Sequence, residues 1–369
     1  MHVVVSNDDD ARNGGPSAHS CDRCPAPAAY TRAYSGQTLC MPCFRASIER
    51  KAAKTISKYG MIRDGDSVAV AVSGGKDSLA LLHIMHGMAQ RHNFEMRAIT
   101  IDEGIPGYRD EALKIASGAC RTLGVPHDVY AYKDLFGVTL DEALGMRQAQ
   151  RKMSSCSICG TLRRRAVDIA AGDADAVATG HNLDDILQTF LINMLSGDTD
   201  KIAWMDPGGI GGGGDDDGGG KKSNRPRRIK PFCEIYESEI VYYAFASRLP
   251  FQEEPCPHMN EGIRTVIREF LNSLESDRSG IKNSMYASVL RMVRMARGEA
   301  VAAAAATITT PGHDPASYAA PRKQRRPCAR CGADCTAGGG GSGVCSACRI
   351  ITDLPGGGVV ARTPANSKV

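Results

Sequence analysis

The stretch SVAVAVSGGKDS, residues 67–78, joins a β-branched apolar run to a glycine turn and then to a helical pattern. A strand, a glycine turn and a helix start together hold phosphate, because backbone N–H groups converge on the anion and the helix N-terminus adds partial positive charge. The stretch therefore predicts a nucleotide-binding loop made of Ser73, Gly74, Gly75, Lys76, Asp77 and Ser78. The alternative is a turn that only connects strand to helix.

The sequence on either side of this loop alternates short β-branched runs with helical patterns. Strands are predicted at Ser67–Val72, Arg97–Asp102, His127–Tyr132 and Asp175–Thr179, and helices at Ser78–Arg91, Tyr108–Leu123, Gly160–Ala171 and Asn182–Leu195. This alternation predicts an α/β fold with a doubly wound parallel sheet. Further helical patterns follow at Glu234–Leu249, Ile263–Leu274 and Gly280–Met295.

A second motif, TGHNLDD at 179–185, also follows a predicted strand and opens a helix. Ligands of open α/β sheets bind at the carboxyl ends of the strands, so this motif is expected beside the glycine loop. Asp184 and Asp185 are candidates for holding Mg²⁺ through water or for acting on the substrate. The alternative is a helix cap, and Asn182 fits both interpretations. Asp102, at the end of the second strand, is expected near the nucleotide.

Fourteen cysteines are many for 369 residues. In a reducing compartment they are metal ligands or catalytic groups more often than disulfides. Two sets of paired CxxC motifs have zinc-ribbon spacing, with fifteen and thirteen residues between the pairs: Cys21, Cys24, Cys40 and Cys43, and then Cys328, Cys331, Cys345 and Cys348. Each set is predicted to hold a structural Zn²⁺, with redox-active pairs as the alternative.

The pair Cys156 and Cys159 has no second CxxC nearby. It is either a redox dithiol or part of another cluster, with Cys256 or Cys233 as the third ligand. Three cysteines leave one iron of a [4Fe–4S] cluster without a protein ligand and able to bind sulfur. Cys120 lies on a predicted helix face and is expected in the core.

Composition limits the remaining possibilities. The net charge of +4 is mild, the N-terminus lacks an apolar signal core, and no stretch reaches the ~18 apolar residues that a membrane span needs. A cytoplasmic protein without membrane attachment is expected. The predicted organisation is 1–20 disordered, 21–63 zinc ribbon and linking helix, 64–299 catalytic domain with a Gly/Asp insertion at 207–224, 300–327 linker, 328–350 second ribbon and 351–369 tail.

The order of these motifs resembles one family. A ribbon is followed by SGGKDS, IDEGIPGYRDE, CSICG, TGHNLDD, KPFCEIYESEIVYYA, EEPCPH and a second ribbon. This is similar to the tRNA 2-thiouridine synthetases of the TtuA, NcsA and cytosolic thiouridylase group, within the PP-loop superfamily that splits ATP into AMP and pyrophosphate. The similarity runs from about Cys21 to Cys348 and omits only the insertion.

The resemblance implies an adenine-nucleotide α-hydrolase-like fold and transfer of sulfur to C2 of a tRNA uridine, with ATP activating the C2 oxygen. It implies ATP contacts at Ser73–Ser78, Asp102, Arg163, Gly180 and Asp185, with Asp185 and Lys76 catalytic. It assigns the cluster to Cys156, Cys159 and Cys256, and zinc to the eight ribbon cysteines. Sulfur is expected from a ubiquitin-like carrier with a thiocarboxylate end, and a homo-oligomer or a paralogous partner subunit stays open.

Three clusters of basic residues are candidates for tRNA contacts: Arg45–Arg63, Arg225–Lys230 and Arg322–Arg326. A solvated surface is the alternative for each cluster. The wobble uridine is the expected target, because IDEGIPGYRDE and the tail ribbon are most similar to the archaeal and eukaryotic branch. The alternatives are the T-loop uridine, a cytidine, or a tRNA-binding subunit without catalysis.

Overall fold

The computed structural model describes residues 20–148, 154–202, 204–209, 226–258, 263–296, 326–330, 334–335 and 343–352. Its centre is a five-stranded sheet in which every pairing is parallel. The order β5–β4–β3–β6–β7 is formed by β5 (His127–Ala131), β4 (Glu95–Asp102), β3 (Ser67–Ala71), β6 (Ala176–Ala178) and β7 (Arg227–Ile229). The predicted α/β fold with a parallel sheet is confirmed.

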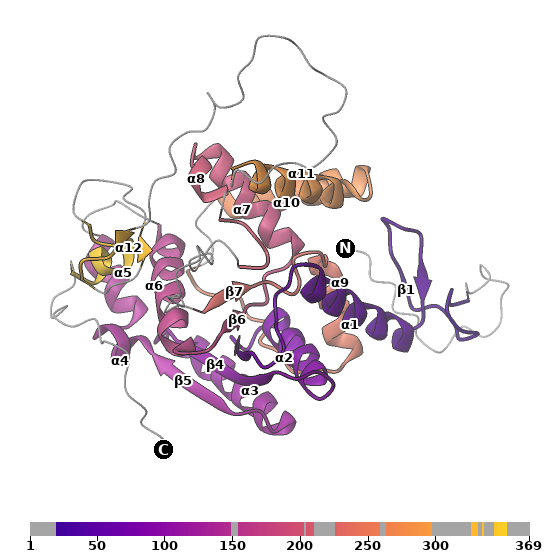
Figure 1. Ribbon diagram of the computed structural model, residues 1–369, viewed down its shortest axis with the longest axis horizontal. Coiled ribbons are helices and arrows are strands. Elements are labelled where there is room, and N and C mark those ends of the chain that lie inside the picture. The colour runs from indigo at the N-terminus through magenta and orange to yellow at the C-terminus, as the bar shows by residue number, and fades with distance from the viewer. Residues whose placement is uncertain are drawn as a thin grey trace, which may run out of the picture.

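Helices cover both faces of the sheet (Figure 1). Successive residues of a strand point to opposite faces, so Val68 and Val70 enter one core while Ala69 enters the other. The first core includes residues of α1 (Met41–Lys58), α2 (Lys76–Ala89), α3 (Tyr108–Leu123), α7 (Leu183–Leu195), α9 (Glu237–Ala246), α10 (Ile263–Asp277) and α11 (Ile281–Ala296). The second includes residues of α4 (Tyr132–Phe136), α5 (Leu140–Gln148), α6 (Ser155–Ala171) and α12 (Ser346–Thr352).

Some predicted boundaries differ from the structure. Helix α6 begins at Ser155, five residues before the predicted start, because the Ser154 side chain caps the Ser157 N–H at 3.3 Å. Strand β7 was not predicted, because two of its three residues are arginines and it lacks the apolar, β-branched run typical of a buried strand. Helices α4, α5 and the short α8 (Thr199–Ile202) were also missed.

The first three residues of the predicted Gly/Asp insertion, 207–209, lie within the described structure. Pro207, Gly208 and Gly209 are buried. A Cβ on Gly208 would lie 2.7 Å from the Tyr59 carbonyl oxygen, so the chain packs closely here. Several expectations lie outside the described residues: most of the disordered N-terminus, the insertion from 210 to 225, the linker up to residue 325, Cys331 and the tail from 353.

The two cysteine-rich modules dock on different parts of the domain (Figure 1). Hairpin β1 (Tyr30–Thr31) and β2 (Thr38–Leu39) precedes α1, which packs on α2 and α9. Of the second module, strands β8 (Arg326–Pro327) and β9 (Asp334–Cys335) pair with each other, and α12 packs on α6 through Ile350 and Ile351. No helix in the described part of the chain combines the length and apolarity needed to cross a bilayer.

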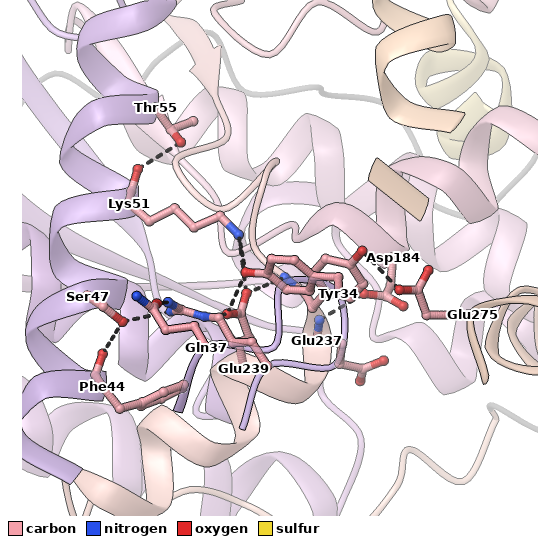
Figure 2. Close-up of polar contacts among 12 residues, drawn as sticks. Tyr34, Gln37, Phe44, Ser47, Lys51, Thr55, Asp184, Glu237, Glu239 and Glu275 are labelled. Atoms are coloured by element: carbon pink, nitrogen blue, oxygen red, sulfur yellow. Dashed lines mark hydrogen bonds and ion pairs between the residues drawn. The ribbon is translucent and has the colours of Figure 1, made fainter. Parts of the chain in front are cut away.

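A buried carboxylate fixes the first module (Figure 2). Glu239 of α9 is fully buried and forms ion pairs with Arg32 at 2.6 Å and Lys51 at 3.3 Å. The Tyr34 hydroxyl donates to it at 3.0 Å. Arg32 also donates to Ser47 at 2.7 Å. The hairpin and α1 are therefore held to the catalytic domain by charge as well as by apolar packing.

Replacing Glu239 should destabilise the protein strongly. Glu239→Ala leaves Arg32 buried without its counter-charge, and removing one partner of a buried ion pair costs about 3–5 kcal/mol. Urea denaturation followed by circular dichroism should show this loss in the free energy of unfolding. Asp128→Ala, which removes an exposed partner of Arg97, should leave it nearly unchanged. Equal effects of the two variants would contradict the structural role of Glu239.

Candidate active site

The glycine loop follows β3 and opens α2. Gly74 has a left-handed φ of 87°, and a Cβ there would lie 2.5 Å from the Ala112 carbonyl oxygen. Only glycine fits this position. Gly75 is the N-cap of α2. The Ser78 hydroxyl accepts from the Ser73 N–H at 3.0 Å and donates to the Gly75 carbonyl at 2.9 Å, which closes the turn.

Lys76 is the first residue of α2, where the helix N–H groups have no preceding helical carbonyl. Its ammonium forms ion pairs with Asp77 and with Glu237, both at 3.0 Å. Burial alone would lower the pKa of Lys76, but the two carboxylates raise it above its usual range. The loop therefore combines the backbone N–H groups at the start of α2 with a fixed cation, and this combination suits the binding of a phosphate group.

The TGHNLDD motif touches this loop. A Cβ on Gly180 would lie 3.0 Å from the Asp77 carbonyl carbon, so the two backbones approach closely. The Asn182 amide donates to the Asp77 carboxylate at 3.2 Å. Asn182 and Asp185 also form a reciprocal capping box at the start of α7. Asn182 is therefore a helix cap and also links the motif to the loop.

The two aspartates of the motif differ in environment. Asp184 is buried and accepts the Glu237 N–H at 2.8 Å (Figure 2). It also pairs with the Lys282 ammonium at 2.5 Å. Its oxygens are therefore used within the protein, and it ties α7, α9 and α11 together. Asp185 is half-buried, and the nearest cation is Arg264 at 3.9 Å. Of the pair, Asp185 is the one available to a ligand.

Asp185 has a perturbed titration. Burial and the neighbouring Asp77 carboxylate raise the pKa of Asp185 to about 6. His181, in the same motif, is surrounded by Lys230, Arg228, Arg264 and Arg164; desolvation and these cations lower the pKa of His181 to about 3. At neutral pH the motif therefore presents a carboxylate and an uncharged imidazole within a positively charged surrounding.

Two cysteines of the third group lie in the first turn of α6. Cys156 is exposed and contacts the carbonyl of His258 at 3.5 Å. Cys159 is partly buried, and Arg163 donates to its sulfur at 3.3 Å. Burial raises the pKa of Cys159, Arg163 opposes that rise, and Cys256 and Cys156 are near enough to add to it. Cys156 therefore contacts the backbone of the segment that carries Cys256, and Cys159 and Cys256 both pack against the second core.

Cys233 lies elsewhere. It is fully buried in the first core, while Cys159 and Cys256 pack against the second. Burial raises the pKa of Cys233 to about 12. Cys120 is also buried in the first core, where burial raises its pKa to about 11. Both thiols have the environment of core residues.

The cysteines and the glycine loop meet at one edge of the sheet. Helix α6 leads into β6, so its N-terminus lies at the carboxyl ends of the strands, where β3 delivers the loop. The Cys256 segment is attached to the loop directly: the Gln252 N–H donates to the Gly74 carbonyl at 3.0 Å. Asp102 ends β4 at this edge and accepts the Gly104 N–H at 2.8 Å.

The ribbon cysteines form two compact groups. The sulfurs of Cys21, Cys24, Cys40 and Cys43 all lie within 4.8 Å of one another, as do those of Cys328, Cys345 and Cys348. Tetrahedral zinc with Zn–S bonds of about 2.3 Å places its sulfurs about 3.8 Å apart. Both groups therefore have the donor type and compactness for a single Zn²⁺. Cys331 lies outside the described residues.

Sequence reasoning missed the residues that orient the site. Glu237, Gln252 and Lys282 are distant in sequence from the groups they contact. Glu103 and Arg109 lie inside the quoted motif IDEGIPGYRDE, yet only the fold shows them to be buried partners. The local signal that could have indicated Glu237 and Glu239 is their place in the first turn of α9, where acidic residues are favoured.

Several predicted RNA contacts are already paired with acidic residues of the same chain. Lys51 pairs with Glu239 and Lys58 with Glu234. Arg227 pairs with Asp66, and Arg228 with Asp168. Lys230 differs, because no hydrogen bond or ion pair joins its ammonium to another residue that the structure describes. Burial lowers its pKa. Arg225 and most of the third cluster lie outside the described residues.

The chain has the PP-loop ATP pyrophosphatase fold. The PP-loop domain family matches residues 45–275, and the N-terminal LIM domain of 2-thiouridine synthetase TtuA matches residues 20–45. The chain belongs to the tRNA 2-thiolation family of PP-loop proteins, and the resemblance expected from the motifs is confirmed.

Three relatives illustrate the membership. Cytoplasmic tRNA 2-thiolation protein 1 of Chlamydomonas reinhardtii is 33% identical over 339 residues, covering 90% of this chain and 84% of that protein. tRNA 2-thiolation protein NcsA of Haloferax volcanii is 32% identical, covering 90% and 98%. The structure of the U34-tRNA thiolase NcsA from Methanococcus maripaludis with its [4Fe-4S] cluster has a TM-score of 0.71 at 27% identity, covering 91% and 96%.

Removing the Asp77 charge should lower the pKa of Asp185. Asp77 raises that pKa, to about 6, by repelling the ionised form of Asp185. In Asp77→Asn the Asp185 carboxylate should therefore persist to lower pH, which carboxyl ¹³C NMR of nucleotide-free protein measures directly. Glu95→Gln, an exposed residue that begins β4 at the opposite end of the sheet from the loop, is the control. An unchanged Asp185 titration in Asp77→Asn would mean that burial alone sets its pKa.

Proposed function

We propose that this protein is an ATP-dependent tRNA sulfurtransferase that forms 2-thiouridine at the wobble position. The observation that supports the proposal is that the segment carrying Cys256 contacts both the predicted phosphate-binding loop, through Gln252, and Cys156, through the His258 carbonyl. The family's named activity, tRNA 2-thiolation, supports the substrate. The U34-tRNA thiolase title of the archaeal structural relative supports the wobble uridine.

The glycine loop binds the phosphates of ATP in this proposal. The uridine O2 attacks the α-phosphorus, pyrophosphate leaves, and C2 then carries an adenylate as a leaving group. Sulfur attacks C2, and AMP departs with the former O2. Lys76 and the N–H groups of the loop stabilise the negative charge of the departing pyrophosphate. To do so Lys76 exchanges part of its pairing with Asp77 and Glu237 for phosphate oxygens.

Asp185 serves the same step from the opposite side of the loop. Its half-exposed carboxylate lies at the start of α7, next to Asp77. It holds Mg²⁺ through water or accepts a proton. Asp102, Gly180 and Arg163 complete the proposed nucleotide surroundings. Arg163 already donates to Glu103 and to Cys159, so its contact with nucleotide uses its remaining N–H groups.

Cys156, Cys159 and Cys256 would hold a [4Fe–4S] cluster. Thiolates are the usual ligands of such clusters, and three of them leave one iron open to bind sulfur. A cluster is larger than a single ion, so its ligands need not be as close together as those of the ribbons. The fit is also electrostatic: Arg163 lies against Cys159 and offsets the charge of bound thiolates.

The proposal also assigns the zinc ligands, the tRNA contacts, the sulfur donor and the cellular compartment. The two ribbons each hold structural Zn²⁺, through Cys21, Cys24, Cys40 and Cys43 and through Cys328, Cys331, Cys345 and Cys348. Lys230 and Arg264, beside Asp185, contact tRNA phosphates. The sulfur donor is a ubiquitin-like carrier, and the protein acts in the cytoplasm. In this proposal residues 21–63 supply the first ribbon and a linking helix, and residues 64–299 form the catalytic domain; the linking helix, α1, also contributes to the first core.

Asp185→Ala should abolish 2-thiouridine formation while leaving tRNA affinity nearly intact. The substitution removes the carboxylate from the reacting region without removing a cation that binds RNA. Nucleoside mass spectrometry of tRNA after reaction measures the product, and filter binding measures affinity. Wild-type product levels in Asp185→Ala would refute the role of Asp185.

Cys256→Ser should prevent normal cluster assembly, whereas Cys233→Ser should not. Cys256 lies with Cys156 and Cys159, while Cys233 is buried in the other core. Anaerobic reconstitution with iron and sulfide, followed by absorbance near the brown cluster band, distinguishes the variants. A normal chromophore in Cys256→Ser together with a lost one in Cys233→Ser would reverse the assignment. Retained colour in both would remove the cluster from this site.

A further inference from the structure

A chain of charged contacts joins Cys159 to the nucleotide loop. Arg163 donates to the Cys159 sulfur at 3.3 Å and to the Glu103 carboxylate at 2.7 Å. The other Glu103 oxygen forms an ion pair with Arg109 at 2.7 Å. Arg109 in turn donates to the Ser73 carbonyl at 2.9 Å and to the Ile101 carbonyl. The chain runs without interruption from a thiol of α6 to the first residue of the loop.

Glu103 is the central member of this chain. Its side chain is only 3% exposed, and that of Arg109 only 5%. A buried carboxylate between two guanidinium groups is costly to leave unpaired, so its geometry is restricted. The Glu103 carbonyl also accepts the Leu140 N–H at 2.7 Å, at the start of α5. Asp141, the next residue, bonds to His258 at 2.8 Å, on the segment that carries Cys256.

Both cysteine-bearing segments therefore depend on the same residue. The Glu103 side chain connects to Cys159 through Arg163. The Glu103 backbone carbonyl connects to the Cys256 segment through the start of α5. Asp102 and Glu103 are adjacent, so the end of β4 both faces the predicted nucleotide and anchors the thiols. Nothing else in the reaction requires a buried carboxylate at position 103, since its oxygens face two arginines and not the loop N–H groups.

We infer that Glu103 is a positioning residue that couples nucleotide binding at the loop to occupancy of the three-cysteine site, through Arg109 on one side and Arg163 on the other. The inference rests on the proposed function. When Cys159 acts as a ligand, Arg163 is fixed against it, which fixes Glu103 and Arg109 and orders the Ser73 carbonyl. A loop that is already ordered loses less conformational freedom on binding nucleotide.

The experiment compares the affinity for a non-hydrolysable ATP analogue before and after cluster reconstitution, by isothermal titration calorimetry under anaerobic conditions. The loaded wild-type protein should bind the analogue on the order of 10-fold more tightly than the cluster-free protein. The ratio of the two dissociation constants, cluster-free over loaded, is called the coupling ratio. In Glu103→Gln, which keeps the size of the side chain and removes its charge, this ratio should fall to near one. The analogue should also protect the cluster absorbance against a chelator in the wild type and not in Glu103→Gln.

Asp168→Asn is the matched control. Asp168 forms a partly buried ion pair on the same helix, with Arg228 of β7 at 2.6 Å. This variant should keep the wild-type ratio. If Glu103→Gln does not fold, Arg163→Met breaks the chain at a side chain that is 49% exposed and should also abolish the ratio.

The outcomes separate the inference from the proposed function. A wild-type ratio retained in Glu103→Gln, or a ratio of one in the wild type, overturns the coupling while leaving the thiolation proposal in place. Failure of the wild type to assemble any cluster overturns both, and the missing chromophore identifies that case. Loss of the ratio in Asp168→Asn as well would show that any damage to α6 has this effect, and would overturn the specific role of Glu103.

Discussion

The contact between the glycine turn after β3 and the motif after β6 determines where every other group of the site lies. β3 and β6 are neighbours in the sheet, and the connections from them leave in opposite directions, to β4 and to β7. Ligands of open α/β sheets bind at such a switch point. Gly74 and Gly180 allow close approach of the backbone there, and the Asn182–Asp77 bond fixes the two segments to each other.

Around this contact the protein uses buried carboxylates as ties between distant elements. Asp184 joins α7 to α11 and to the start of α9. Glu239 joins α9 to the first cysteine module, and Glu103 joins β4 to α3 and α6. Each is nearly inaccessible to solvent and each faces at least one cation or N–H donor, as buried charges require. Helix α9 is shared by two of these ties, so the first ribbon and Lys76 are connected through one short helix.

The two cysteine types differ in how they are built. Ribbon cysteines lie on local turns, with the Arg23 and Cys348 N–H groups directed at sulfur, and their geometry is set by a few neighbouring residues. The proposed cluster ligands are Cys156 and Cys159 of α6 and Cys256 of a loop about a hundred residues later. Its geometry depends on the packing of α6 on the sheet and on the bond from Gln252 to the loop. A change that disturbs the packing of the domain should therefore displace Cys156, Cys159 and Cys256 more than it displaces the ribbon cysteines.

The sequence by itself determined the α/β class, the glycine loop, the ribbon spacings and the family, because each depends on residues that are close in the chain. It also indicated Cys256 over Cys233, though only through resemblance. Tertiary structure alone decided that Asp184 is committed to Lys282 while Asp185 is available, that Arg227 and Arg228 serve internal pairs, and that Glu103 connects thiols to loop. These contacts join residues that are far apart in the sequence: Asp184 and Lys282 are 98 residues apart, and Arg227 and Asp66 are 161 residues apart. They also depend on burial, because an ion pair is stronger away from water, and no local sequence pattern shows which side chains will be buried.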